Sequence, residues 1–358
     1  MKKITLILSI LYSTLANSIE IPWYFDDPSI TQKSSINANQ LVLGAINKPV
    51  VVAVIDSGVN SDHPSLKGKV LPGFDMVSAD INPRGGRSSN YFPDAKDAKC
   101  PSTHQTNGSN SNHGTEVASV ITGNGELSVN GINPSAMILP IRAIGPCSAN
   151  YKDLIDSILW AVGLPVEGVP DNPTPAKVLN ISIAGGNTIC SDNLQETINK
   201  ASAKGAIIIS AAGNTFGKAA QEPSVCKGVI SVGSVNPDKS LTFYSPHDSR
   251  IQLYTPGGGK NINDEKGIIN RIKVATFRED ILGNLEAIGA YTAIGTSYSS
   301  PMVAGVIADI LSGKNSITPE ELLTEINKQL PLDSEYGYRI LNYEKLKRPT
   351  ISQNTNNN

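Results

Sequence analysis

Residues 49–55 read PVVVAVI, and the chain continues with Asp56, Ser57 and Gly58. A continuous run of apolar, mostly β-branched residues is typical of a strand that is buried on both faces. Such strands occur in parallel sheets covered by helices, so this stretch predicts the central strand of an α/β fold. The run ends in a carboxylate and a turn glycine, which places Asp56 at the carboxyl end of the strand.

Further apolar runs alternate with helical patterns along the chain. Strands are predicted at residues 136–144, 177–183, 206–211 and 229–235, and helices at residues 151–162 and 193–204. Thr318, Pro319 and Glu321 add the start of a capped C-terminal helix. This alternation implies βαβ crossovers. We therefore predict an α/β three-layer sandwich with a mostly parallel, doubly wound sheet.

Composition excludes several classes of protein. The 358 residues are 39% hydrophobic and 17% charged, which suits a globular protein with a large core. Lys and Arg number 30 against 32 Asp and Glu, a net charge of −2, so nothing points to nucleic acid as a partner. No stretch is long and apolar enough to predict a membrane span.

The first 18 residues have the pattern of a secretory signal peptide. Lys2 and Lys3 precede an apolar run at residues 4–15, and residues 16–18 (ANS) place small side chains at the cleavage site. We expect a secreted protein, extracellular or periplasmic. One domain is predicted over residues 19–348, followed by a polar tail at residues 349–358.

The chain has four cysteines, Cys100, Cys147, Cys190 and Cys226. An even number in an exported chain predicts disulfides, and three pairings are open at this point. No two cysteines have the Cys-x-x-Cys spacing of zinc ribbons or of thioredoxin-like redox sites.

Four segments carry side chains that suit nucleophilic catalysis. Asp56 ends the first strand, and His113, Asn214 and Ser297 lie in the segments NHGT, SAAGN and GTSYSSP. Each alone is weak, because an Asp at a strand end is more often a cap, a single His is usually structural, an Asn after Gly is typical of a turn, and Gly-Thr-Ser occurs by chance. Together they match one chemistry, because a serine hydroxyl needs an imidazole to accept its proton and the imidazole needs a carboxylate to orient it. Asn214 can donate to an oxyanion together with the Ser297 backbone N–H.

The order Asp, His, Asn, Ser in these motifs resembles the subtilisin-like serine proteases (subtilases), over roughly residues 45–345. The resemblance implies a subtilisin-like fold and a secreted serine endopeptidase that hydrolyses peptide bonds through an acyl-enzyme. In it Asp56 orients His113, His113 is the general base, Ser297 is the nucleophile and Asn214 stabilises the oxyanion.

Within that family the chain is similar to exported bacterial members with two disulfides. That similarity implies the pairs Cys100–Cys147 and Cys190–Cys226.

Substrate binding in subtilases is by strand addition, in which an extended peptide pairs with exposed backbone of the enzyme. The resemblance assigns this role to Ser182, Ile183 and Ala184, although the family usually has Gly where this chain has Ala184. On the opposite side, residues 148–150 replace the usual Gly-Gly.

Other positions depart from the family pattern. Glu116 and Ser119 follow the histidine motif, Tyr298 stands where Met is common, and Met302 replaces His. We expect the Tyr298 ring to crowd the leaving-group side of Ser297.

The loop at residues 75–100 contains Asp80, Asn82, Asp94 and Asp97, in a region where relatives often bind calcium. Because Arg84, Arg87 and Lys96 dilute the negative charge and Ca²⁺ needs six to eight oxygens, a solvated loop is favoured over a metal site. No cofactor is required for the predicted chemistry.

The main prediction is therefore a monomeric peptidase that acts on proteins or peptides, without nucleic-acid or membrane partners. The alternative is an exported binding protein on a subtilase scaffold with an obstructed cleft. Tyr298, Ala184 and residues 148–150 motivate it, and labelling by a fluorophosphonate distinguishes the two hypotheses.

Overall fold

The computed structural model describes residues 21–29, 33–44, 48–82, 84–93, 112–145, 149–259, 270–279, 284–313 and 317–347. Both the predicted signal peptide and the predicted tail lie outside these ranges. The helices are α1 (Asn39–Val42), α2 (His113–Thr122), α3 (Tyr151–Ala161), α4 (Asp192–Ala203), α5 (Thr296–Ser312), α6 (Pro319–Gln329) and α7 (Tyr343–Lys347), with short 3₁₀ turns η1 (Trp23–Phe25), η2 (Pro64–Leu66) and η3 (Glu126–Ser128). The strands are β1 (Val51–Asp56), β2 (Phe74–Asp75), β3 (Met137–Arg142), β4 (Val178–Ile181), β5 (Ile207–Ala211), β6 (Val229–Val235), β7 (Leu253–Pro256), β8 (Ile272–Glu279) and β9 (Leu285–Ala293).

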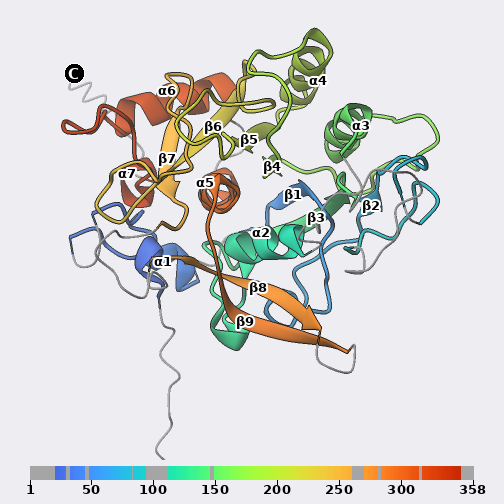
Figure 1. The fold of residues 1–358 in the computed structure, drawn as a ribbon, viewed down its shortest axis with the longest axis horizontal. Helices are drawn as coiled ribbons and strands as arrows, with labels where there is room; N and C mark the ends of the chain where they lie inside the picture. Colours follow the sequence, from blue (N-terminus) through green and yellow to red (C-terminus); the bar gives the residue numbers. More distant parts are fainter. Residues whose placement is uncertain are drawn as a thin grey trace, which may run out of the picture.

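Strands β1 to β7 form one sheet in the order β2-β3-β1-β4-β5-β6-β7, parallel throughout (Figure 1). The five strands predicted from apolar runs are confirmed as β1, β3, β4, β5 and β6. The strand β1 lies between β3 and β4, and its last residue, Asp56, is in register with Arg142 at the end of β3. The carboxyl ends of the strands therefore form one edge of the sheet, and Asp56 lies at that edge.

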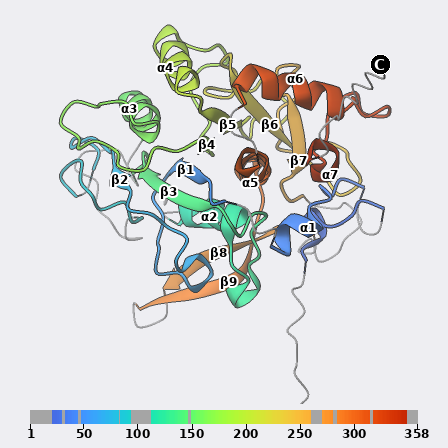
Figure 2. The same ribbon diagram turned by 180° about the vertical axis from the view of Figure 1, so that it is seen from behind.

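Helices cover both faces of the sheet. Along β1, Val52 and Val54 pack in one core cluster with residues of α2 and α5, whereas Ala53 and Ile55 pack in a second cluster with residues of α3 and α4. This alternation is the period of two expected of a strand buried on both faces. Figures 1 and 2 show α5 running against the middle of the sheet, with α3 and α4 on the opposite side. The predicted three-layer α/β sandwich is confirmed.

The glycines and the capping box that were predicted to end or begin helices are found at those helix ends. Gly163 and Gly205 follow α3 and α4 with φ of +75° and +76°, the left-handed conformation that ends a helix without a steric penalty. At the start of α6, the Thr318 side chain accepts from the Glu321 backbone N–H, and the Glu321 carboxylate accepts from the Thr318 N–H. This is the capping box predicted from the sequence.

An antiparallel hairpin, β8–β9, lies outside the main sheet and was not predicted. It packs against α2, as Figures 1 and 2 show. One side chain of α2 and the side chain of its N-cap residue form hydrogen bonds with the backbone of the hairpin. Asn112 Nδ2 donates to the Phe277 carbonyl at 3.0 Å, and Ser119 Oγ accepts from the Ala275 N–H at 2.9 Å. The hairpin is thus docked on the helix that begins with His113.

Cys190 and Cys226 form a disulfide, with their Cα atoms 4.9 Å apart. This bond joins the start of α4 to the segment before β6. The second predicted pair, Cys100–Cys147, lies outside the described residues. One of the two implied disulfides is therefore confirmed and the other stays a prediction.

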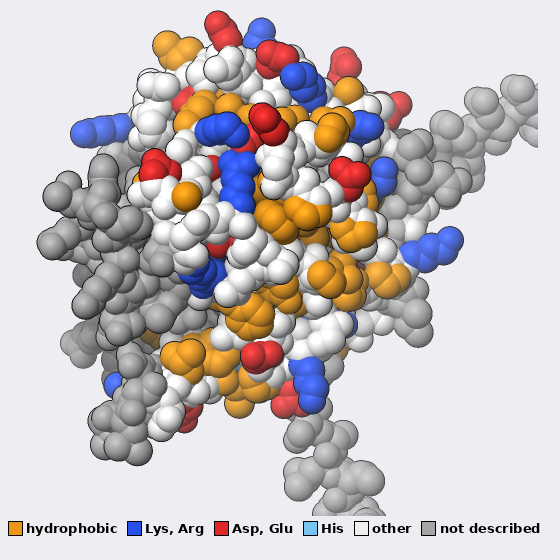
Figure 3. Space-filling model, turned by 90° about the vertical axis from the view of Figure 1, so that its right-hand side faces the viewer, with side chains coloured by type: hydrophobic (Ala, Val, Ile, Leu, Met, Phe, Trp, Pro, Cys, Tyr) orange, Lys and Arg blue, Asp and Glu red, His pale blue; other side chains and the backbone are white. Residues whose placement is uncertain are grey.

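The face drawn in Figure 3 carries basic and acidic side chains interspersed among apolar ones. A surface that binds a phosphate backbone instead gathers basic side chains on one face. None of the described helices has the length and apolar character needed to cross a bilayer.

Candidate active site

The carboxyl edge of the sheet brings Asp56 and His113 together. His113 is the first residue of α2, and its Nδ1 lies 2.8 Å from Asp56 Oδ1. The same oxygen accepts from the Ser57 backbone N–H at 2.7 Å, and the Asp56 side chain is fully buried. With Nδ1 donating to the carboxylate, Nε2 is the ring nitrogen left to accept a proton.

Gly114 allows this contact. A Cβ atom at Gly114 would lie 2.2 Å from the Gly58 carbonyl oxygen and 3.1 Å from the Asp56 Cβ. Because any larger residue would collide with the turn after β1, the glycine of the HGT motif lets α2 begin directly against that turn.

The surroundings of His113 favour its charged form. Burial of the ring lowers its pKa, but the charge of Asp56, the hydrogen bond to Asp56 and the charge of Glu116 outweigh burial and raise the pKa to about 9. The His113 side chain is 23% exposed, so water screens these charges in part. The two carboxylates therefore hold the pKa of His113 above its usual 6.5.

Ser297 lies in the first turn of α5, and Asn214 follows β5. The Asn214 amide oxygen accepts from both the N–H and the hydroxyl of Thr296, each at 3.1 Å. These two bonds orient the side-chain amide, and its NH₂ group donates to none of the residues that the structure describes. An amide held by its oxygen with its NH₂ group available suits an oxyanion donor.

The two residues that flank Ser297 contact the other candidate side chains. Thr296 binds Asn214, and the Tyr298 ring lies 5.7 Å from the His113 ring. The Ser297 hydroxyl itself donates to the Ser182 carbonyl at 3.2 Å and not to His113. In unbound sites such hydrogen bonds are often long or differently directed.

The predicted substrate segment follows β4 on the other side of Ser297. The Ser182 hydroxyl is bound to the start of α5, at 2.9 Å from the Ser297 carbonyl oxygen and 3.0 Å from Ser300 Oγ. In contrast, the backbone groups of Ile183 and Ala184 have no hydrogen-bond partner among the described residues. These groups are available to pair with an extended peptide, and their role in substrate binding stays a prediction.

Tyr298 does not lie where the sequence suggested. Its side chain is 5% exposed and its hydroxyl donates to Glu116 Oε2 at 2.6 Å. The prediction that this ring crowds the leaving-group side is therefore wrong, because a buried carboxylate on α2 draws the phenol inward. Met302 is fully buried on the next turn of α5.

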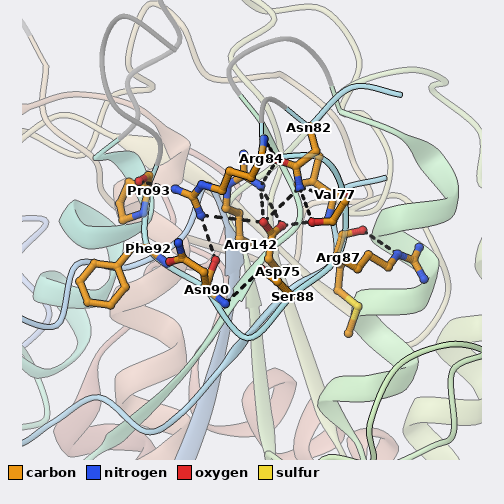
Figure 4. Close-up of polar contacts among 12 residues, drawn as sticks. Asp75, Val77, Asn82, Arg84, Arg87, Ser88, Asn90, Phe92, Pro93 and Arg142 are labelled. Atoms are coloured by element: carbon orange, nitrogen blue, oxygen red, sulfur yellow. Dashed lines mark hydrogen bonds and ion pairs between the residues drawn. The ribbon is translucent and has the colours of Figure 1, made fainter. Parts of the chain in front are cut away.

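The described part of the loop after β2 is held by guanidinium groups (Figure 4). Arg142 Nη1 contacts both oxygens of Asp75 at 2.7 Å, and both side chains are fully buried. Asn82 Nδ2 donates to Asp75, while Arg84 donates to the carbonyls of Asn90 and Pro93. Asp75 and Asn82 are thus buried and not solvated, whereas the preference for a solvated loop over a metal site stays a prediction.

Asp80 of the same loop is exposed, and Asp94, Lys96 and Asp97 lie outside the described residues. Arg87 joins the loop to α3 by donating to Asp153 at 2.9 Å and to Asp156 at 2.6 Å. Within the described ranges, one cluster of three side chains has metal-ligand spacing: Cys190, Glu222 and Cys226. Its two sulfurs form the disulfide and so offer no thiolate.

An Asp–His pair, a helix-initial serine and an oriented amide at the edge of a parallel sheet are the groups that serine hydrolases of the α/β class use. The chain belongs to the Subtilase family, whose profile matches residues 47–345.

Two curated relatives carry protease names. The extracellular basic protease of Dichelobacter nodosus is 34% identical over 320 residues, which are 83% of this chain and 50% of that protein. The extracellular protease of Xanthomonas campestris pv. campestris is 31% identical over 341 residues, 90% of this chain and 54% of that protein. The chain therefore spans about half the length of these relatives.

A solved structure agrees with the fold. A protease of Pseudoalteromonas arctica superposes with a TM-score of 0.74 at 30% identity, covering 88% of this chain and 94% of that chain.

The buried Asp75–Arg142 pair generates a first prediction. Replacing Arg142 by Met leaves the Asp75 carboxylate buried without its main partner, so we expect a loss of about 3–5 kcal/mol in the free energy of unfolding. Urea denaturation of the two proteins measures it. The control is Lys200→Met, which removes an exposed ion pair with Glu196 and should cost less than about 1 kcal/mol. Equal losses in the two variants would contradict the prediction.

Proposed function

We propose that this chain is a secreted serine endopeptidase that hydrolyses peptide bonds of proteins or peptides through an acyl-enzyme on Ser297. The observation that carries the proposal is the 2.8 Å contact of His113 with Asp56. It is supported by Ser297 in the first turn of α5, because Thr296 donates to Asn214 and the Tyr298 ring lies 5.7 Å from the His113 ring. The protease names of the curated relatives support the same activity.

In this mechanism a rotation about the Ser297 Cα–Cβ bond carries its hydroxyl from the Ser182 carbonyl towards His113. His113 takes the proton, and Ser297 Oγ forms a bond to the substrate's carbonyl carbon. The oxyanion accepts from Asn214 Nδ2 and from the Ser297 N–H at the start of α5. His113 then gives the proton to the amine as the C–N bond breaks, which leaves the acyl-enzyme. In the second half His113 takes a proton from water, the water oxygen bonds to the acyl carbon, and the ester bond to Ser297 breaks as His113 returns the proton to Ser297 Oγ. Asp56 holds the imidazole and stabilises its charged form.

The peptide substrate pairs with the free backbone groups of Ile183 and Ala184. Ala184 also lies close to Gly213, because a Cβ atom on Gly213 would meet the Ala184 Cβ at 3.3 Å. The methyl group of Ala184 thus narrows the space between the two segments that flank Ser297.

A fluorophosphonate probe, which forms a covalent bond to an activated serine, separates this proposal from the binding-protein alternative. We expect the folded, secreted protein to be labelled and Ser297→Ala not to be. A folded protein that never reacts at Ser297 would support the alternative. The burial of Tyr298 already removes one of the three features that suggested an obstructed cleft.

Kinetics of variants test the assigned roles. Ser297→Ala and His113→Ala should each remove nearly all peptidase activity, and combining them should add little, because the two side chains act as a unit. Asn214→Ala should lower kcat by about 10²–10³, the magnitude known for the equivalent donor in subtilisin. Near-normal turnover of Ser297→Ala would refute the nucleophile assignment.

The pH dependence follows from the surroundings of His113. A general base acts only in its neutral form, so kcat/KM should be low at acidic pH and rise as His113 loses its proton. Because the carboxylates hold the pKa of His113 above its usual 6.5, the midpoint of this rise should lie above 6.5 and no higher than about 9. A rate profile with its acidic midpoint below 6 would contradict the proposed environment.

We also propose that the loop at residues 75–93 is stabilised without calcium. Arg84 and Arg142 supply the positive charge beside Asp75, and Arg84 takes the carbonyl oxygens of Asn90 and Pro93 that a calcium ion would need. Dialysis against EDTA should therefore leave Tm and activity unchanged. A fall in Tm that added calcium reverses would show a metal site in the chain.

A further inference from the structure

Three departures from the subtilase pattern, Glu116, Ser119 and Tyr298, meet in one buried network. The Tyr298 hydroxyl donates to Glu116 Oε2 at 2.6 Å, and the Thr276 hydroxyl of β8 donates to Glu116 Oε1 at 3.0 Å. Ser119 Oγ donates to the Glu116 backbone carbonyl at 2.6 Å and accepts from the Ala275 N–H. The network therefore joins α2, α5 and the β8–β9 hairpin.

The carboxylate of Glu116 is deeply buried, with 1% of the residue exposed. Removing a carboxylate from water is costly unless each oxygen receives hydrogen bonds. Here each oxygen has a hydroxyl donor. Burial, together with the charge and hydrogen bond of Glu116, raises the pKa of Tyr298 well above its usual 10, so the phenol keeps its proton and remains a donor.

This carboxylate lies beside the proposed general base. Glu116 is three residues after His113 on α2, which places both side chains on neighbouring parts of one helix surface. Between α2 and α5, the Tyr298 ring lies 5.7 Å from the His113 ring at an interplanar angle of 58°. The imidazole is therefore held by Asp56 at Nδ1 and flanked by the ring whose hydroxyl binds Glu116.

Among the described residues, the charged and titratable groups that act on His113 or Tyr298 come from four elements. Asp56 ends β1, Glu116 is on α2, Tyr298 is on α5, and Tyr291 of β9 acts on Tyr298 from the hairpin. Asp56 and Glu116 are carboxylates, and their charges favour a positive charge on the imidazole.

We propose that Glu116, held by Tyr298 and Thr276, is a second positioning carboxylate for His113, in addition to Asp56. Its negative charge stabilises the imidazolium that forms when His113 takes a proton, and the Tyr298 ring limits the movement of the imidazole. The catalytic consequence rests on the proposed peptidase function, whereas the effect on the protonation of His113 does not.

The test is therefore a histidine titration that needs no turnover. The Ser297→Ala variant, which cannot cleave itself, is labelled at its four histidines. The histidine signals are followed by NMR as a function of pH. A further His113→Gln change identifies the signal of His113. Glu116→Gln keeps the shape of the side chain and removes its charge, so the His113 midpoint should fall by about one pH unit. The control is Glu126→Gln, the same change at an exposed glutamate, which should leave the midpoint unchanged. Equal His113 midpoints in Glu116→Gln and Glu126→Gln would overturn the proposal.

A second variant covers the case in which Glu116→Gln does not fold. Glu116→Leu combined with Tyr298→Met replaces the polar pair by apolar side chains, which is often neutral or stabilising at buried sites. The His113 midpoint should fall as in Glu116→Gln. An unchanged midpoint in this double variant would also overturn the proposal, because both carboxylate and phenol are then absent.

Activity provides the link to function. With Ser297 present, Glu116→Gln should move the rise of kcat at acidic pH to lower pH. The maximal kcat should fall roughly threefold, since a weaker base transfers the proton more slowly, and KM should stay unchanged. A purely structural role would lower Tm without moving this rise, and that result would count against the proposal. If the wild-type protein neither reacts with a fluorophosphonate nor cleaves peptides, the proposed function fails while the titration still decides the role of Glu116.

Discussion

The parallel pairing of β1 with β3 and β4 is the constraint on which the site depends. The pairing buries both faces of β1 and ends it at Asp56, in register with Arg142 of β3. The same packing that holds the strand therefore removes the Asp56 carboxylate from water. A buried carboxylate requires donors, and the Ser57 N–H and the His113 imidazole supply them to one of its oxygens. The position of His113 is thus a consequence of how the strand is buried.

The main sheet could be predicted from the sequence because its inner strands are apolar runs of four to seven residues. The other elements lack that signal. β2 has two residues, and β8–β9 is a hairpin whose residues are partly exposed and whose register shifts between Val274 and Thr276. The hairpin is held by α2 side chains about 160 residues earlier in the chain, a contact that no local pattern contains.

The four candidate side chains could be found from their motifs, because the chemistry restricts residue types. The directions in which these side chains and their neighbours point could not be predicted. The Ser297 hydroxyl faces the Ser182 carbonyl, and the Tyr298 ring turns inward to Glu116, 182 residues away. The loop after β2 shows the same limit. Its arginines suggested a solvated segment, yet Arg84 lies beside the buried carboxylate of Asp75, which also binds the buried Arg142.

The departures at Glu116 and Tyr298 also show why single positions mislead when they are read one at a time. Alone, a glutamate on the buried side of α2 would be an uncompensated charge, and a tyrosine after Ser297 would be a bulky neighbour of the nucleophile. Together with Thr276 they satisfy one another, because each oxygen of the carboxylate receives a hydroxyl. Changing one member leaves a buried polar group without its partner, which costs more than changing the pair to apolar residues of similar size. The three side chains therefore act as one unit in the packing between α2, α5 and the hairpin, and the departures at Glu116 and Tyr298 have their physical meaning only together and with Thr276.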